Sequence, residues 1–394
     1  MAEEKKKAEG KKKRRRGHNE GSIYQRKDGR WASDVSLGYE NGKRKRITLY
    51  GQSRNDVHEK LTDYLHKQQK GEVIPTGKKT LGEFLDDWLK DSVKPALRPR
   101  TYASYEEAVR LHIKIGLGHM RLSKLTGQHV QRFLNQLATK DSAVDKDKKL
   151  SPRTVAYNRT VLRMALEQAC EWRLIPHNPA AIRVSLAKVE KRKIEPWTLE
   201  QRQALIKAVE GDRLSALFLV LLFVGLRKGE ALGLHWQEVD LEARKLRVHE
   251  QLQRINKALV LSTPKTEKSQ REVTIPALVV TALQKHRKDQ REEQMKARLV
   301  WQDTGLVFTT PVGSPVDPRN VKRVLDRLLK NAKLPHCRIH DLRHQFASNM
   351  LACGVDLKIV SDCLGHSQLA ITADTYAHVS QDLIRDAMDK AATR

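Results

Sequence analysis

The sequence predicts a multidomain, mainly α-helical protein with small amounts of β-structure: an N-terminal βββα module, a helical bundle and a mixed α+β C-terminal domain. Two observations lead to this fold class. The chain has 394 residues, more than one domain usually holds, and 39% of them are hydrophobic, enough to build packed cores. A β-rich texture before residue 50 also changes to helical periodicity from Thr80 onward and returns only in the second half of the chain.

The first residues, MAEEKKKAEGKKKRRR, predict a disordered basic tail (1–16), because a charged run of low complexity cannot bury a core. Residues 17–74 predict the βββα module. Three β-rich runs are separated there by Asp28-Gly29 and Asn41-Gly42, which favour hairpin turns because they tolerate positive φ. A helix follows, from SRNDV to KQQKG.

One face of this module is predicted to contact DNA. In the third strand Ile47 and Leu49 point inward by alternation, and in the first strand Ile23 does the same. The opposite, basic face can enter a DNA groove, although a solvated sheet face explains the pattern equally well. The predicted DNA-contacting residues are Tyr24, Arg26, Arg44, Arg46 and Thr48.

Residues 78–185 predict a bundle of four helices. Leu81 opens the first apolar helical face, and two further helices start near Thr101 and Thr126. Ser151-Pro152 marks the last start, with a serine N-cap and a proline at the first helical position. A basic linker, AKVEKRKIEP, then leads into the third region.

Residues 190–394 predict helices that flank one β-rich insert. The apolar run LSALFLVLLFVGL (214–226) is too short to span a bilayer and predicts a buried core helix. Arg227 follows it at the start of the next helix, and Lys265 lies at a turn between two strands.

Composition indicates the kind of binding partner and the cellular compartment to expect. With 75 Lys and Arg against 47 Asp and Glu, the formal net charge of +28 suits a long polyanion, because each neutralised phosphate releases counterions. No amphipathic membrane anchor stands out, so we expect nucleic acid and no membrane partner. No apolar signal stretch opens the chain, and its cysteines form no CxxC pair, which predicts a cytoplasmic protein. The cysteines are Cys170, Cys337, Cys353 and Cys363.

Four residues near the C-terminus complete a chemical set with Arg227 and Lys265. His340 and Arg343 are spaced i, i+3 and share one helical face, His366 follows a glycine, and Tyr376 comes ten residues later. Two guanidinium groups can hold one phosphate and stabilise the charge that grows in its transition state. A tyrosine can attack phosphorus, and lysine and histidine can move protons. No metal is needed and no nucleotide loop is present, so we expect no cofactor.

Each residue alone has an ordinary structural explanation. Arg227 can form a surface salt bridge, Lys265 can be hairpin charge, and a lone Tyr376 more often packs in a core. His340 and His366 can cap a helix or bind a backbone carbonyl. The functional prediction therefore depends on all six residues, in this order, in a basic chain.

The six residues together resemble the tyrosine recombinase (phage integrase) family. Its pattern is an Arg, a Lys in a β-hairpin, His-x-x-Arg, a His or Trp, and then Tyr. The matching segments here are GLRKGEALGL, TPKT, HDLRH, LGHS and TADTYAH, and Glu230 matches an acidic residue expected to brace the site. The resemblance implies a core-binding helical domain (78–185), a tyrosine-recombinase catalytic domain (190–394) and an arm-type DNA-binding domain (17–74), as in lambda-type and conjugative-transposon integrases.

The resemblance also implies a mechanism. Tyr376 would form a 3′-phosphotyrosine, stabilised by Arg227, Arg343 and His366, with Lys265 as general acid and His340 assisting the tyrosine. Implied partners are double-stranded DNA with core and arm-type attachment sites, three further copies in a tetramer, and an excisionase or DNA-bending host protein. The product would be an integrated or excised mobile element or prophage, made in the cytoplasm on the nucleoid.

Two alternatives use the same residues differently. A type IB topoisomerase shares this chemistry but would cut and reseal one strand without a partner site. A non-catalytic DNA-binding regulator would dock on DNA with the same modules, but it gives no reason for an intact set of six residues. The arm-like module and the short distance from LGHS to the tyrosine favour the recombinase.

Overall fold

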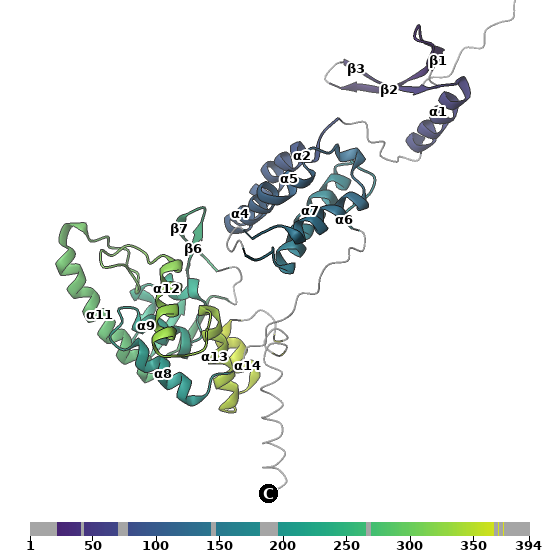
Figure 1. Cartoon of the computed structure of the whole chain (residues 1–394). Coiled ribbons are helices and arrows are strands. Elements are labelled where there is room, and N and C mark those ends of the chain that lie inside the picture. Colours follow the sequence, from purple (N-terminus) through teal and green to yellow (C-terminus); the bar gives the residue numbers. More distant parts are fainter. Residues whose placement is uncertain are drawn as a thin grey trace, which may run out of the picture. The chain divides into compact units, whose positions relative to one another are not determined.

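The structure is a computed structural model that describes residues 22–40, 43–69, 78–142, 147–181, 196–264, 269–365 and the single positions 369 and 373. The chain divides into two compact units, Met1–Glu190 and Lys191–Arg394, and each is described by itself (Figure 1). Helices dominate and the sheets are small, which confirms the predicted fold class.

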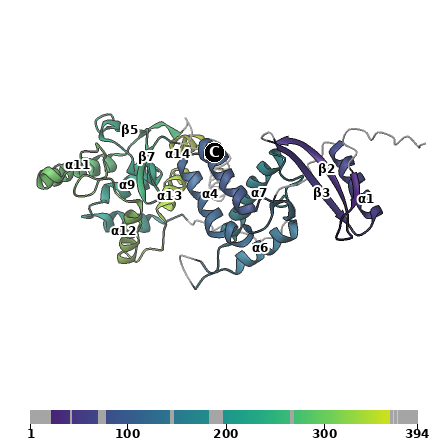
Figure 2. The same ribbon diagram turned by 90° about the horizontal axis from the view of Figure 1, so that it is seen from above.

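The N-terminal module is a three-stranded antiparallel meander with one helix. The strands β1 (Ser22–Gln25), β2 (Trp31–Glu40) and β3 (Lys43–Gly51) pair in chain order, and α1 (Arg54–Gln69) lies along one face (Figure 2). Val35, Leu61 and Tyr64 form the core between sheet and helix, with Ile23, Ile47 and Leu49 packed against it. The predicted βββα order and its inward face are therefore confirmed.

One of the two predicted hairpin turns of this module lies among the described residues. Gly29 has φ +80°, as the Asp28-Gly29 turn requires, whereas Asn41 and Gly42 lie outside the described residues. The helix begins as predicted, since the Ser53 hydroxyl accepts a hydrogen bond from the backbone N–H of Asp56 at 3.1 Å.

Four helical rods form the bundle, as predicted, and the first two contain short π-helical segments. The first rod is α2 (Leu81–Asp87), η1 (Trp88–Val93) and α3 (Lys94–Ala96); the second is α4 (Pro99–Ala108), η2 (Val109–Ile113) and α5 (Lys114–Leu117). A 3-10 turn, η3 (Leu122–Lys124), precedes α6 (Gly127–Thr139) and α7 (Pro152–Glu171). Thr126 and Ser151 cap α6 and α7 with their hydroxyls, so both predicted starts are confirmed.

The C-terminal unit is helical around two small sheets. Its first elements are α8 (Leu199–Val209), α9 (Ser215–Phe223), α10 (Lys228–Leu232) and η4 (Trp236–Glu238). One sheet has the order β4 (Val239–Asp240), β5 (Lys245–Val248) and β8 (Arg271–Thr274), and the hairpin of β6 (Gln251–Ile255) and β7 (Ala258–Ser262) is inserted between β5 and β8. The last elements are α11 (Ala277–Ala297), η6 (Arg298–Val300), α12 (Pro318–Asn331), α13 (Ile339–Ala352) and α14 (Leu357–Leu364).

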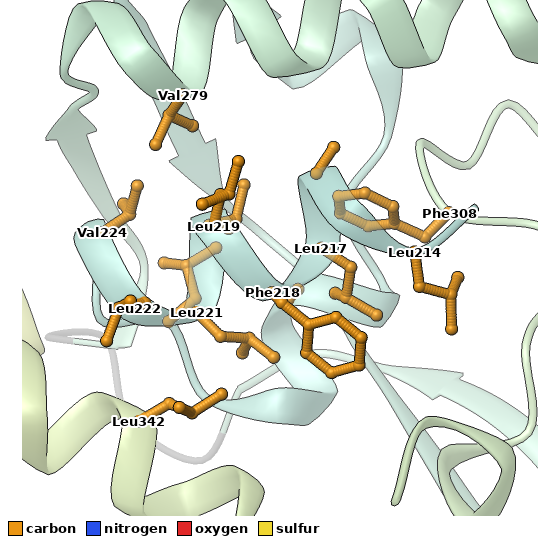
Figure 3. Packing of buried hydrophobic residues seen from close by; sticks show 14 of the residues in the cluster. Leu214, Leu217, Phe218, Leu219, Leu221, Leu222, Val224, Val279, Phe308 and Leu342 are labelled. Atoms are coloured by element: carbon orange, nitrogen blue, oxygen red, sulfur yellow. The ribbon is translucent and has the colours of Figure 1, made fainter. Parts of the chain in front are cut away.

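The apolar helix α9 lies at the centre of this unit, which confirms the predicted core helix. Its residues from Ala216 to Leu222 are all buried. Figure 3 shows Leu217, Phe218 and their neighbours packed with side chains from other elements, among them Leu342 of α13. Within the described part of the chain, no helix combines the length and hydropathy needed to cross a membrane.

Candidate active site

A tight turn after α9 presents Arg227. Gly225 has φ +70°, and a Cβ atom at this position would lie 2.4 Å from Cδ1 of Phe346, so only glycine fits without strain. The chain then reaches Arg227, the N-cap residue of α10, whose backbone N–H donates to Glu230 Oε2 at 2.9 Å. The turn therefore fixes the backbone position of Arg227 at the start of α10.

Glu230 joins two arginines in a buried position. It is 2% exposed, and its Oε1 accepts from Arg227 Nη1 at 2.6 Å while its Oε2 accepts from Arg271 Nη2 at 3.2 Å. Burial alone would raise the pKa of Glu230, but the guanidinium groups of Arg271 and Arg227 outweigh it and hold the pKa below its usual range. The ionised carboxylate braces Arg227 from within the protein.

Arg343 connects the Gly225 turn to the end of α14. It extends from α13, is 2% exposed, and donates from Nη1 to the Gly225 carbonyl at 2.7 Å and from Nη2 to the Leu364 carbonyl. A buried charge is tolerated only with such partners, so the position of the guanidinium is set by the backbone around it.

His340 lies one helical turn before Arg343 and keeps an exposed edge. Its ring meets that of His344 edge to face, with the ring centroids 4.9 Å apart. Packed atoms around the ring, then His344 and Arg343, lower the pKa of His340 to about 4. The imidazole is therefore neutral at neutral pH and able to accept a proton.

Three arginines converge on the C-terminal end of α14. Gly365 ends this helix with φ +63°, and the last carbonyl groups of a helix lack partners inside it. Here the carbonyl of Cys363 accepts from Arg271 Nε at 2.7 Å, that of Leu364 from Arg343, and that of Gly365 from Arg227 Nη2 at 3.3 Å. The next residue in the chain is His366.

The structure thus brings together part of the predicted set. Arg227 and Arg343 meet at the end of α14, and His340 lies beside Arg343. Lys265, His366 and Tyr376 lie outside the described residues.

Arg271 is a functional candidate that the sequence analysis did not identify. Alternation over residues 271–275 could have identified it, because Arg271, Val273 and Ile275 (the residue after β8) fall on one face and the latter two are buried. Lys265 falls in the chain between β7 and β8, two strands that belong to different sheets, and β8 pairs with β5.

The predicted DNA face of the N-terminal sheet contains an acidic residue, Asp34, that the sequence analysis did not identify. Tyr24, Arg26 and Arg46 are exposed and Thr48 is half-buried, but Asp34 lies among them and accepts from the hydroxyls of Tyr24 at 3.0 Å and Thr48 at 2.5 Å. Arg44 pairs with Tyr39 through the backbone, and its side chain lies outside the described part.

No three His, Cys, Asp or Glu side chains approach closely enough to hold a metal ion in the parts of the chain that the structure describes.

Family models match both units of the chain. The model described as "Phage integrase family" matches residues 197–382, and "Phage integrase, N-terminal SAM-like domain" matches residues 80–138. A "Tyrosine recombinase XerC-like" protein of Caldanaerobacter subterraneus is 32% identical over 364 residues, covering 88% of this chain and 91% of the relative. The chain belongs to the phage integrase family of tyrosine recombinases. It is an enzyme of site-specific DNA recombination, and the topoisomerase and regulator alternatives are not favoured.

More distant relatives cover nearly the whole recombinase. The ICEBs1 integrase of Bacillus subtilis is 23% identical, covering 94% of this chain and 98% of the relative. Among solved structures, the Tn1549 transposon integrase in complex with a circular intermediate DNA has a TM-score of 0.65 at 21% identity, covering 80% of this chain and 100% of that one. A lambda integrase dimer bound to a COC′ core site has a TM-score of 0.54 at 17% identity, covering 90% and 93%. These structures share the fold.

Proposed function

We propose that this recombinase integrates and excises a mobile element or prophage by cutting and rejoining DNA through a 3′-phosphotyrosine at Tyr376. The observation that carries the proposal is the convergence of Arg227 and Arg343 on the end of α14, one residue before His366. Two fixed guanidinium groups beside a histidine suit a phosphate whose negative charge grows during reaction.

In the proposed reaction the Tyr376 hydroxyl attacks the scissile phosphorus while its proton passes toward His340, which is neutral and able to accept it. The bond between phosphorus and the 5′-oxygen breaks, and Lys265 protonates that oxygen. Arg227, Arg343 and His366 stabilise the transition state. Rejoining reverses these steps with the 5′-hydroxyl of a partner duplex, so no nucleotide is consumed.

The domain roles are part of the same proposal. We assign residues 78–185 to the core attachment site, residues 190–394 to catalysis, and residues 17–74 to arm-type sites. The match of residues 80–138 to the SAM-like domain of phage integrases and the exposed basic side chains of the small sheet support these roles.

Strand exchange requires several copies. A lambda integrase has been solved as a tetramer bound to a Holliday junction, and on that likeness of fold we propose that four copies of this chain act together. An excisionase or a DNA-bending host protein is the proposed partner that sets direction. We place the reaction in the cytoplasm, on nucleoid DNA.

The decisive test is a suicide-substrate assay. The full chain is mixed with candidate attachment-site DNA nicked near the crossover point and run on a denaturing gel beside Tyr376→Phe. A covalent protein–DNA band that requires the tyrosine establishes the nucleophile. No band on the element's own attachment sites contradicts the proposal, and cleavage of arbitrary duplex revives the topoisomerase alternative.

The arm assignment has a separate test. Removal of residues 1–74 should leave cleavage at the core site intact but impair integration between complete attachment sites. Integration at the full rate by this truncated chain would refute an arm-binding role.

A further inference from the structure

We propose that Arg271 is a positioning residue for recombination: it fixes Glu230 and the end of α14, and through them the Arg227 guanidinium and the backbone that leads to His366. This inference rests on the proposed role of Arg227 at the scissile phosphate. It adds a residue that belongs neither to the six-residue set nor to the acidic brace.

Arg271 is committed to internal partners. Its side chain is 8% exposed, and each of its three guanidinium nitrogens donates to a different acceptor: Nε to the Cys363 carbonyl at 2.7 Å, Nη2 to Glu230 Oε2 at 3.2 Å, and Nη1 to the Ser269 carbonyl at 3.2 Å. Arg227, by contrast, keeps 35% of its side chain exposed. Arg227 can therefore reach a DNA phosphate, whereas Arg271 acts from behind it.

The first effect of Arg271 is on charge. Glu230 is a buried carboxylate shared by two guanidinium groups, so neither cation is fully neutralised by it. Without Arg271, Glu230 would face Arg227 alone and would cancel more of the positive potential that Arg227 offers to a phosphate. Loss of Arg271 should therefore weaken stabilisation of the transition state more than binding of the ground state.

The second effect is on geometry. Arg271, Arg343 and Arg227 each take one of three consecutive carbonyl groups at the end of α14, from Cys363 to Gly365. Arg271 is the member of this trio that also holds the carboxylate braced against Arg227. Outer contacts of this kind orient the groups that touch a substrate, and a displacement of about 1 Å caused by a change away from the reacting atoms can slow a reaction by about 100-fold.

The test compares Arg271→Gln and Arg271→Lys with a matched control. Arg213 makes an equivalent set of contacts elsewhere in the same unit, donating from Nε and Nη2 to Glu293 at 2.6 Å each and from Nη1 to the Thr309 carbonyl at 2.5 Å. Arg213→Gln therefore removes an ion pair of the same type that is more exposed (31% for Arg213 and 23% for Glu293) and shares no partner with Arg227. All variants are full-length chains, checked by thermal unfolding and by DNA binding.

The rate of covalent-complex formation is measured at saturating protein on nicked attachment-site DNA. Arg271→Gln should slow this rate by up to roughly 100-fold with little change in DNA affinity, and Arg213→Gln should keep the wild-type rate. Arg271→Lys retains the positive charge but lacks the planar guanidinium group and its hydrogen-bond donors. It should react faster than Arg271→Gln if the charge of Arg271 contributes more than its hydrogen bonds. This variant also serves as the test if Arg271→Gln does not fold.

A second readout separates positioning from general structural damage. A methylphosphonate at the scissile position replaces one charged oxygen with a methyl group, which lowers the need for the Arg227 cation. Relative to wild type, the defects of Arg227→Ala and Arg271→Gln should both shrink on this substrate, and any defect of Arg213→Gln should not.

The outcomes are distinguishable. No covalent complex from the wild-type chain overturns the proposed function and this inference with it. A reactive wild type with an equally reactive Arg271→Gln overturns the inference alone. So does an Arg271→Gln defect that the methylphosphonate leaves unchanged while it relieves Arg227→Ala.

Discussion

Two groups of basic residues in this recombinase are held in opposite ways. In the C-terminal unit Arg343 is 2% exposed and Arg271 is 8% exposed on its side chain, and both donate to backbone carbonyls of α14. In the N-terminal sheet Arg46 is exposed, and Arg26, also exposed, contacts the side chains of Asp28 and Tyr50. The first group is fixed by the fold, and the second lies on the surface.

The difference matches the two roles on DNA that we propose for these groups. Stabilising a transition state requires charges that are already in place, because reorganisation at the moment of reaction would cost free energy. Binding along a duplex depends on the number of neutralised phosphates and tolerates side chains that adjust. We therefore expect substitutions in the first group to change the rate of reaction and those in the second to change affinity.

The largest effect is expected from Arg343→Ala. It removes a buried cation and leaves the carbonyls of Gly225 and Leu364 without that donor, so covalent-complex formation should fall by about 10²–10³-fold. The full chain should also lose roughly 2–4 kcal/mol of stability in urea unfolding. Arg46→Ala, the same change at an exposed position, should cost less than about 0.5 kcal/mol. Equal losses for the two variants would remove the distinction between the groups.

Gly225→Ala tests the turn beneath Arg343. The new methyl group would lie 2.4 Å from Phe346 in a backbone with φ +70°, so we expect a loss of about 2–5 kcal/mol together with slower cleavage, because strain and overpacking add. Gly211→Ala is the matched control, because Gly211 has φ +78° but nothing within 4 Å of the added atom. It should cost about 1–2 kcal/mol, from the left-handed backbone alone, and leave cleavage unchanged. A Gly225→Ala chain that cleaves at full rate would contradict the role given to the turn.

Local signals explain which parts of the fold could be predicted. The cap at Ser151, the cap at Thr126 and the apolar run of α9 depend on neighbours in sequence, and all three are confirmed. Arg227 at the start of α10 belongs to the same class, because the core helix and the turn before it are local features.

Partners distant in sequence explain what could not be predicted. Arg271 binds the Cys363 carbonyl 92 residues away, and no feature of the sequence near either residue indicates that contact. The pairing of β8 with β5 is hidden in the same way by the intervening hairpin, whose turn at Asn256 and Lys257 has positive φ at both residues without the usual glycine. Asp34 falls on the predicted DNA face through cross-strand register, which a single strand does not reveal.

Arg46→Ala should have a smaller effect, on DNA affinity alone. On a short duplex carrying the terminal sequence of the element, it should weaken binding and reduce the slope of log affinity against log salt by about 1, because one phosphate contact is lost. Lys60→Ala is the control, since Lys60 lies on α1, which covers the other face of the sheet. If both variants change the slope equally, the sheet face has no special role in DNA binding.

The smallest effect is expected from the titration of His340. Its pKa is lowered from 6.5 to about 4, first by burial and then by His344 and Arg343, with Asp341 opposing the shift. The unfolded chain therefore binds this proton more readily than the folded chain between pH 6.5 and 4. The resulting stability is present above pH 6.5 and is lost as the pH falls toward 4.

Because His340 keeps an exposed edge, the loss of stability should be small, and His340→Gln should flatten this part of the stability curve. Solvent at the exposed edge reduces the shift as well, so an NMR titration of the DNA-free chain, assigned with that variant, should give a midpoint below 6.5. A midpoint at 6.5 would show that the packed atoms, His344 and Arg343 do not affect the ring.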